Sequence, residues 1–398
     1  MPAKSTEAGA VSVVSSLPLS AHHDQSTLPP GLLAELTGTV PADLMKALEQ
    51  LSDPRARRGK RHPLATVLGI AVCAVLTGAR SFQAITEWAH DLPPSVRDRL
   101  GITGWPPSES TIRRVLQLID SAQFDLLVSR WLARRAGPSP ALLVIAIDGK
   151  TCRGARTGTE RAVHLLAALD TSNGTVLGQC VVDGKTNEIT AFGPLLDRID
   201  IKGALITADA LHTQRAHVTY LLGREAHYLL TVKGNQQALL RQLVDLPWTR
   251  IPIADRTISK GHGRTERRTV KLTSLAAGIN FPGAQTAVQI TRQRKTKTGA
   301  WHTEVIYAIT DLGFRQIDPA TLADAARAHW GIENRLHWVR DVTFAEDLSQ
   351  IRTGSGPAVM ATLRNLAVSL HRLAGATNIA AACRRVSRHP NRVIAMLG

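Results

Sequence analysis

The first third of the chain has the apolar periodicity of α-helices. Leucines recur at spacings of three and four residues between Leu44 and Leu51, a long apolar segment follows Pro63, and a shorter amphipathic segment spans residues 81–90. Side chains spaced in this way form one face of an α-helix. We therefore predict an all-helical region over residues 33–136. Residues 1–32 are rich in Ser, Pro and Ala without any period, and we predict a disordered tail there.

The pattern changes to that of β-strands near residue 140. An apolar run ends in Asp148, and it is typical of a central strand that is buried on both faces. Two further apolar runs flank Asn173 and Gly174, a dipeptide that strongly favours a β-hairpin. After a helical segment, another apolar run ends in Asp209, and a shorter one begins at His227. This order of strand, hairpin, helix and strands predicts an α/β fold with a mixed sheet.

Residues 246–311 differ in composition and form a predicted insertion in this sheet domain. Three segments alternate apolar and polar residues, as antiparallel strands do when one face is solvated. Basic side chains greatly outnumber acidic ones here, so the solvated face is predicted to be basic. From residue 319 the pattern is helical again. We assign residues 137–375 to one α/β domain with a basic, β-rich insertion, and residues 376–398 to a basic C-terminal tail.

The overall composition of the 398 residues is that of a folded, soluble chain. Hydrophobic residues make up 44% and charged residues 20%, and the mean hydropathy is -0.04. These values exclude both a polytopic membrane protein and a wholly disordered chain. The most apolar run, at residues 67–77, is shorter than the roughly 18 residues that a membrane-spanning helix needs. We predict no association with a membrane.

The net charge is the unusual bulk property. The chain has 48 Lys and Arg side chains against 32 Asp and Glu, which gives +16 and a sequence pI near 10.4. Such an excess indicates a polyanionic partner, with nucleic acid as the leading candidate. The four cysteines form no CxxC pair and the N-terminus lacks a secretory signal, so we expect a reducing, cytoplasmic compartment.

Two acidic residues that close apolar strands are the leading candidates for chemistry. Asp148 and Asp209 each stand where a rigid sheet fixes the position of a side chain at its edge. Carboxylates suit Mg²⁺, which prefers oxygen ligands, and a pair of such ions can activate water for phosphodiester cleavage. Glu333 is the candidate for a third carboxylate. The alternative is that each Asp is an ordinary turn or helix cap.

A polar row accompanies Glu333 on a predicted helix. His329, Glu333 and His337 recur every four residues and therefore share one helical face, with Arg340 about one turn further along. That face is too polar to be simple core. One interpretation places it at an acidic active site, and the alternative is that the two histidines and Glu333 bind a transition metal.

Two basic clusters lie in the predicted helical region. Residues 55–61 hold several basic side chains and no acidic one, which favours contact with phosphates over an ordinary solvated turn. A predicted helix after Ser108 displays Arg113 and Arg114 opposite its apolar face. This helix either contacts DNA in the manner of a helix-turn-helix motif or has a solvated basic face.

The chain resembles the DDE transposases of bacterial insertion sequences, in particular the branch that includes the H-repeat-associated proteins. The resemblance rests on three blocks in order and spacing, namely AIDGKTCRGA, then ITADALHTQ with the later YLLTVKGNQ, then HWGIENRLHWVRDVTFAEDLSQIR. The helical region before the first block also looks like the one that precedes the catalytic domain in that branch. Residues 40–375 are covered, and together the blocks are far more specific than any single acid.

The resemblance implies an RNase H-like catalytic core with a β-rich insertion. Its motif assigns the catalytic, metal-binding acids to Asp148, Asp209 and Glu333, which would bind two Mg²⁺ ions, with Mn²⁺ as a substitute. The implied reaction cuts a strand at the transposon end, and the released 3′-OH then attacks target DNA. Both steps are in-line phosphoryl transfers without a protein nucleophile.

The wider group also carries Tyr, Arg and Lys around the Glu. The matching positions hold Ala326, His329 and Arg340, so the Tyr is absent while polar character remains at the other two. The implied partners are transposon terminal repeats and target DNA, bound by a homodimer at the bacterial nucleoid. The predicted DNA contacts are Arg57, Arg58, Lys60, Arg113, Arg114, Lys150, Arg153, Lys233, Arg264, Arg268, His329 and Arg340.

Two other functions remain open at this point. One is a catalytically inactive, transposase-derived protein that binds end sequences and represses. The other is an RNase H-like nuclease that cleaves DNA without strand transfer. Metal-dependent cleavage of DNA would exclude the repressor. Recovery of joined DNA products would exclude the nuclease.

Overall fold

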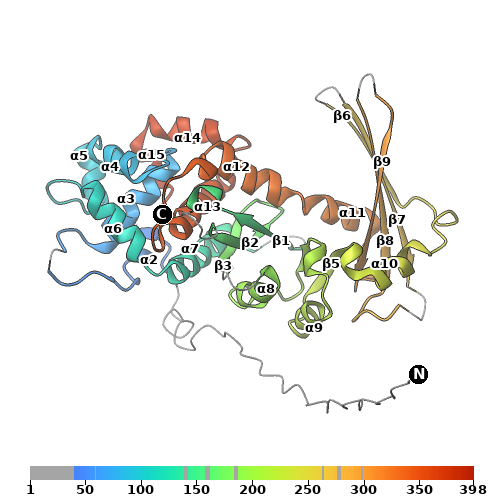
Figure 1. Cartoon of the computed structure of the whole chain (residues 1–398). Helices are drawn as coiled ribbons and strands as arrows, with labels where there is room; N and C mark the ends of the chain where they lie inside the picture. The colour runs from blue at the N-terminus through green and yellow to red at the C-terminus, as the bar shows by residue number, and fades with distance from the viewer. Residues whose placement is uncertain are drawn as a thin grey trace, which may run out of the picture.

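The computed structural model shows a helical region at one end of the molecule and a sheet of strands that extends to the other (Figure 1). The predicted disordered tail lies outside the described residues. The structure describes residues 40–58, 60–138, 142–156, 162–182, 187–261, 264–275, 279–296 and 299–398.

The predicted helical region is observed. Its helices are α2 (Leu44–Leu48), α3 (Leu64–Leu76), α4 (Phe82–His90), α5 (Pro94–Arg99), α6 (Glu109–Leu118) and α7 (Ser121–Ala136). Helix α3 is apolar all round and buried along its whole length, as a central helix of a bundle should be. The side chains of Asp43, Ser81 and Asp120 cap the helices that follow them, because each accepts hydrogen bonds from free backbone N–H groups.

The strands described form one sheet of mixed direction. Their order across the sheet is β3-β2-β1-β4-β5-β9-β8-β7-β6. Strands β1, β2 and β3 are antiparallel neighbours, whereas β1, β4 and β5 run parallel. The expected α/β class, with a mixed sheet behind an all-α region, is confirmed. The core strands are β1 (Val144–Thr151), β2 (His164–Asp170), β3 (Val176–Val182), β4 (Leu205–Ala208) and β5 (His227–Val232).

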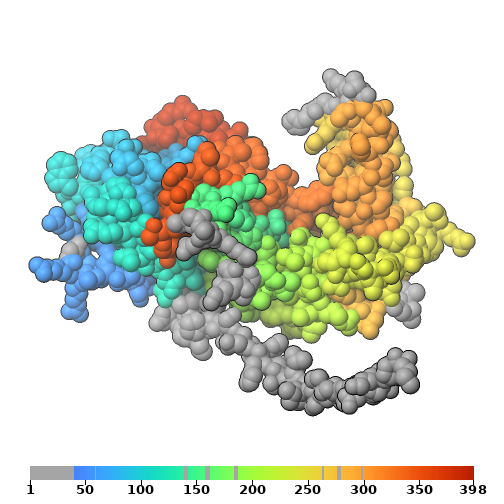
Figure 2. Space-filling model, in the orientation of Figure 1, coloured from blue at the N-terminus to red at the C-terminus, as the bar shows by residue number. Residues whose placement is uncertain are grey.

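The β-rich insertion continues the core sheet. Strand β9 pairs antiparallel with β5, so the inserted strands add to the edge of the core instead of forming a sheet of their own. One strand, β6, was not among the three that the pattern predicted. The inserted strands are β6 (Asp255–Gly261), β7 (Arg264–Ser274), β8 (Thr286–Thr296) and β9 (His302–Thr310). Figure 2 shows them standing apart from the helical region, with the surface hollowed between the two.

Helices cover both faces of the core sheet. On one face, α8 (Glu188–Leu196) and α9 (Arg215–Gly223) pack on Ile145 and Ile147, and α10 (Gln237–Val244) packs beside them. On the other face, α13 (Gly356–Leu373) packs between the sheet and the helical region. The buried side chains of α13, α3 and α7 form one core with Ala146 of β1, so the helical region and the sheet share a hydrophobic interior.

The C-terminal residues fold back onto the helical region. Residues 376–398, predicted to be a tail, contain α14 (Ile379–Ser387) and α15 (Pro390–Ala395). Leu44 N donates to Leu397 O at 2.8 Å, which ties the end of the chain to α2. Among the residues described, none of the helices is both long enough and apolar enough to cross a bilayer.

Candidate active site

Asp148 and Asp209 lie side by side at one edge of the core sheet. Strands β1 and β4 run parallel, and the pairing of Ile147 with Ala208 places the next residue of each strand at the same level. Asp148 is not the last residue of its strand, because β1 continues to Thr151 in its pairing with β2. Asp209 follows β4 directly, and its carboxylate accepts a hydrogen bond from Leu211 N at 2.9 Å. It thereby caps the short helix η2 (Ala210–His212).

Glu333 begins a π-helical turn between two α-helices. Helix α11 (Pro319–Ala328) precedes this turn, η4 (Glu333–His337), and α12 (Trp338–Val342) follows it. Trp338 N donates to Glu333 O, five residues back, which defines the turn. Single π turns are rare and are frequently found at functional sites. The wider turn explains why the predicted row of three residues on an α-helical face is not observed as such.

The turn brings Glu333 and His337 to Asp148. His337 Nδ1 lies 3.2 Å from Glu333 Oε2 and 3.6 Å from Asp148 Oδ2. Ligand atoms of these three residues all lie within 4.8 Å of one another. The side chain of His337 is only 3% exposed, whereas that of Glu333 is 64% exposed. The group is therefore buried on the side of His337 and open to solvent on the side of Glu333. His329 lies elsewhere, and its Nδ1 is 3.2 Å from Thr207 Oγ1.

The electrostatics of Asp148 favour a positively charged ligand. Burial raises the pKa of Asp148, and the carboxylates of Glu188 and Asp209 raise it further, while His337 opposes them. The hydrogen bond from His337 lowers the pKa of Glu333. The ionised form of a partly buried carboxylate with two acidic neighbours is stabilised when a cation binds beside it.

The donor set of this group fits a divalent cation. The two carboxylates are the oxygen ligands that Mg²⁺ and Mn²⁺ prefer, and the imidazole is a ligand that transition metals accept as well. Nε2 of His337 is buried and forms no hydrogen bond within the described part of the chain, whereas Nδ1 faces Glu333 and Asp148. Asp209 is not a member of the three-residue group, and it stands beside the group at the end of the neighbouring strand.

Lys150 and Arg153 follow Asp148 along the chain and differ in exposure. Lys150 is 9% exposed and its Nζ lies 2.7 Å from Asp341 Oδ2 of α12. This ion pair ties β1 to the helix that follows Glu333. The side chain of Arg153 is 81% exposed, and its Nε lies 3.9 Å from Asp347 Oδ2. Arg153 is therefore free to reach a phosphate, whereas Lys150 is held inside the protein.

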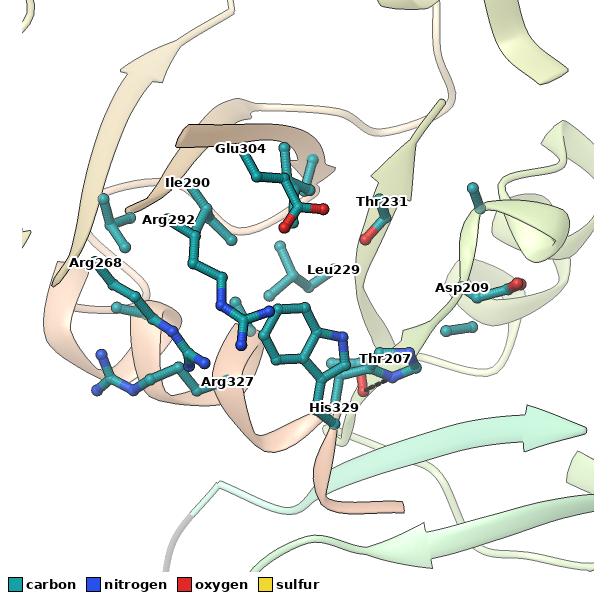
Figure 3. Close-up of a pocket in the computed structure, with 18 of the residues that line it drawn as sticks. Thr207, Asp209, Leu229, Thr231, Arg268, Ile290, Arg292, Glu304, Arg327 and His329 are labelled. Atoms are coloured by element: carbon teal, nitrogen blue, oxygen red, sulfur yellow. Dashed lines mark hydrogen bonds between the residues drawn. The ribbon is translucent and has the colours of Figure 1, made fainter. Parts of the chain in front are cut away.

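A pocket opens beside Asp209 between the core sheet and the insertion. Its volume is about 140 Å³, and Figure 3 shows Asp209 at one end with Arg268, Arg292 and Arg327 at the other. Leu229 and Ile290 line its apolar floor. The indole of Trp330 also lines the pocket, and two guanidinium groups lie over it, that of Arg268 at 5.0 Å and that of Arg292 at 4.6 Å from the ring centroid.

Two ionisable groups of this pocket lie close to Asp209. Burial lowers the pKa of His329 to about 4, although the charge of Asp209 opposes the shift, so the imidazole is neutral at pH 7. Lys233 is exposed at the rim. Both were predicted contacts to DNA, and the structure places both beside Asp209.

Arg340 requires a correction. It was predicted to contact DNA, but its side chain is 0% exposed and pairs with Glu346 at 2.8 Å. Arg364 pairs with the same carboxylate at 2.7 Å. Burial alone would raise the pKa of Glu346, but the charges of Arg340 and Arg364 outweigh it and lower that pKa to about 2. A guanidinium enclosed in this way does not reach a phosphate, so Arg340 holds α12 to the core.

The other predicted DNA contacts lie on α6, on the insertion and in the basic loop before α3. Arg113 and Arg114 are exposed on α6, where Arg113 pairs with Glu109 at 3.1 Å. On the insertion, Arg264 is exposed and Arg268 is half-buried against Trp330. In the basic loop before α3, Arg57, Arg58 and Lys60 are exposed, and Lys60 pairs with Asp53 at 3.3 Å.

The sequence pattern gave no sign of one further acid at this edge. Glu188, the first residue of α8, is close enough to affect the pKa of Asp148. Its contacts with His164 and His212 come from three distant segments, which no local spacing reveals. His337 did carry a signal, because it shares the four-residue spacing with Glu333.

The fold and the acidic site define an α/β protein with carboxylates gathered at one edge of its sheet, and comparison with known proteins specifies its family. The family described as "Transposase DDE domain" matches residues 139–370, and the family "DDE_Tnp_1-associated" matches residues 45–132. The chain therefore belongs to the DDE transposase family.

Relatives among curated proteins agree. The chain is 32% identical to "Putative transposase YncI" of Escherichia coli O157:H7 over 83% of its own length and 87% of that protein. It is 29% identical to "H repeat-associated putative transposase YhhI" of Escherichia coli K12 over 82% of its length and 90% of that protein. Among solved structures, a piggyBac transposase synaptic complex with hairpin DNA matches with a TM-score of 0.39 and 11% identity, over 92% of this chain and 80% of that one.

Proposed function

We propose that this chain is an active DNA transposase of an insertion sequence, which cuts the ends of its element and joins them to target DNA. The observation that carries the proposal is the convergence of Asp148, Glu333 and His337 within 4.8 Å beside Asp209. Three elements far apart in the sequence contribute these side chains. A decayed, DNA-binding relative has no need to keep acids together at a cost in electrostatic repulsion.

The acids Asp148 and Glu333, with Asp209 from the next strand, would hold Mg²⁺ or Mn²⁺. A bound cation supplies charge stabilisation at the phosphoryl oxygens and lowers the pKa of a bound water. His337 orients Glu333 through their 3.2 Å contact, and the Lys150–Asp341 pair fixes α12 against β1. The rigid sheet beneath Asp148 and Asp209 keeps both carboxylates at one edge, as in-line displacement requires.

The charged surfaces support binding of DNA on both sides of this edge. The inserted strands carry Arg264, and helix α6 carries Arg113 and Arg114, with a hollow between the two regions (Figure 2). Phosphate contacts of this kind give affinity that does not depend on sequence and that weakens as salt increases. We propose that two copies of the chain act together on a pair of transposon ends.

The products of the reaction test the proposal. A linear duplex that ends in the element's own terminal repeat, supplied with supercoiled target plasmid and Mg²⁺, should give both nicked ends and joined products. Glu333→Gln should give neither, whereas Glu225→Gln, on a surface far from the site, should match the wild type. Cleavage without joining would favour the nuclease alternative, and binding without cleavage would favour the repressor.

A further inference from the structure

A cluster of one carboxylate and two imidazoles lies behind the acidic edge and has no role in the function proposed above. Glu188 accepts hydrogen bonds from His164 Nε2 at 2.7 Å and from His212 Nε2 at 3.2 Å. His164 is the first residue of β2, and its Nδ1 lies 2.8 Å from Thr151 Oγ1 of β1. His212 ends η2, the short helix that Asp209 caps. This His–Glu–His cluster thus joins α8, β1–β2 and η2.

The cluster touches the backbone next to Asp148. Successive side chains of a strand point to opposite faces, so Gly149 faces away from Glu333 and toward α8. A Cβ atom at Gly149 would lie 2.2 Å from Glu188 Oε1 and 2.7 Å from His164 Nε2. Glycine at this position therefore permits the carboxylate to lie directly against β1. The contact is made one residue from the first acid of the site.

The position of Asp209 depends on η2, because the sheet ladder no longer fixes it. Strand β4 ends at Ala208, the last residue that pairs with both β1 and β5. A three-residue 3₁₀ turn has little stability of its own. It is held from behind by His212, which is 1% exposed and lies against Phe192 with ring centroids 5.1 Å apart. Glu188 provides the hydrogen bond that fixes the orientation of this imidazole.

We propose that Glu188 is a positioning residue of the active site, which sets the turn that carries Asp209 relative to the strand that carries Asp148. Glu188 acts through His212 on one side and through His164 and Gly149 on the other. The two histidine hydrogen bonds hold the pKa of Glu188 at about 2, so its carboxylate is ionised at neutral pH and accepts from both rings. The catalytic part of this inference rests on the proposed function, while the structural part does not.

The test uses Glu188→Gln in the full chain. The amide keeps the volume of the side chain but has one acceptor oxygen instead of two, so one of the two imidazole N–H groups meets an N–H₂ donor in place of an acceptor. Glu225→Gln is the matched control, because Glu225 is 69% exposed and its ion pair within the described ranges is with the equally exposed Lys202. Thermal unfolding of both variants monitors global stability.

The first readout is backbone hydrogen exchange of the metal-free protein. Glu188→Gln should exchange faster at residues 209–213, while the buried helix α13 retains its protection. Unchanged exchange at residues 209–213 would overturn the proposal. Equal acceleration in α13 would also overturn it, because the role of Glu188 would then be general stability. This readout decides the structural part even if the wild type cuts no DNA.

The second readout is metal-dependent cleavage of a terminal-repeat duplex. Groups that orient metal ligands typically contribute about 10- to 100-fold to metal affinity or activity. Glu188→Gln should lower kcat within that range and leave the KM for DNA unchanged. A rise in KM without a change in kcat would contradict a positioning role. The double variant with His212→Gln should lose no more than the larger single loss, because both act through one hydrogen bond.

Discussion

Nδ1 of His337 lies 3.6 Å from Oδ2 of Asp148, so an imidazole from a π turn meets an acid from the central strand of the sheet. The same nitrogen lies 3.2 Å from Glu333 Oε2. Because His337 is buried, its position is fixed from behind and it holds Glu333 near the sheet edge. The site therefore depends on one histidine as well as on the three acids of the motif.

Replacement of His337 should weaken binding of a divalent cation. Glutamine at this position fills a similar volume but does not reproduce the imidazole nitrogen between the two carboxylates. We expect the affinity for Mn²⁺, measured by titration calorimetry, to fall about 10- to 100-fold in His337→Gln. His302→Gln, on an exposed position of β9, should bind Mn²⁺ as the wild type does. An unchanged affinity in His337→Gln would show that the histidine is dispensable.

Gly149→Ala should destabilise the protein. The new methyl group would lie 2.2 Å from Glu188 Oε1, which forces the carboxylate or the strand to move. Overpacking of this kind typically costs about 1–3 kcal/mol in the free energy of unfolding, which urea denaturation measures. Gly193→Ala is a matched control, since a Cβ atom there meets nothing within 4 Å and Gly193 lies inside α8. The control should be neutral or slightly more stable than the wild type.

Glu346→Gln should be far more destabilising than a surface substitution. Its carboxylate is 1% exposed and neutralises two buried guanidinium groups, those of Arg340 and Arg364. Removing one member of a buried ion pair typically costs about 3–5 kcal/mol, because the remaining charges lose their partner. Denaturant unfolding beside Glu225→Gln measures the difference. A loss below about 1 kcal/mol would mean that the buried arginines find other partners.

Acid should remove the same stabilisation. The pKa of Glu346 is about 2 in the folded protein against 4.5 for the free side chain, so the folded state favours the ionised form. The contribution, about 3 kcal/mol, is fully present above pH 4.5 and is lost as pH falls toward 2. Unfolding free energies measured across this interval should decline steeply in the wild type. Glu346→Gln should decline less, and an equal decline in both would contradict the assignment.

The sequence predicted the elements whose signals are local. Apolar runs located the strands that carry Asp148 and Asp209, and the turn at Asn173 and Gly174 is the observed β2–β3 connection, with Gly174 at φ 77°. Strand β6 and the pairing of β9 with β5 were missed, because the first is mostly polar and the second joins segments far apart in the chain.

The sequence misled where tertiary contacts override the usual preference of a residue type. Arg340 was predicted to contact a phosphate because it matches a polar position around the Glu of the family motif, yet Glu346 and Arg364 enclose it in a buried network. The π turn at Glu333 was also hidden, since a pattern of four-residue spacings is interpreted as an α-helix. Both differences between prediction and structure lie in the helical segment that carries Glu333. Side chains of this segment contribute to the acidic site and also pack in the core.

Single-turnover cleavage by the wild type and by Asp148→Asn tests the central claim most directly. Each protein is incubated with a terminal-repeat duplex at low salt, with Mg²⁺ or with EDTA. The account predicts cleavage by the wild type only when the metal is present, and a rate at least about 1,000-fold lower in Asp148→Asn, with DNA binding retained. Metal-dependent cleavage by Asp148→Asn at the wild-type rate would contradict it, because the acid at the centre of the site would then be unnecessary.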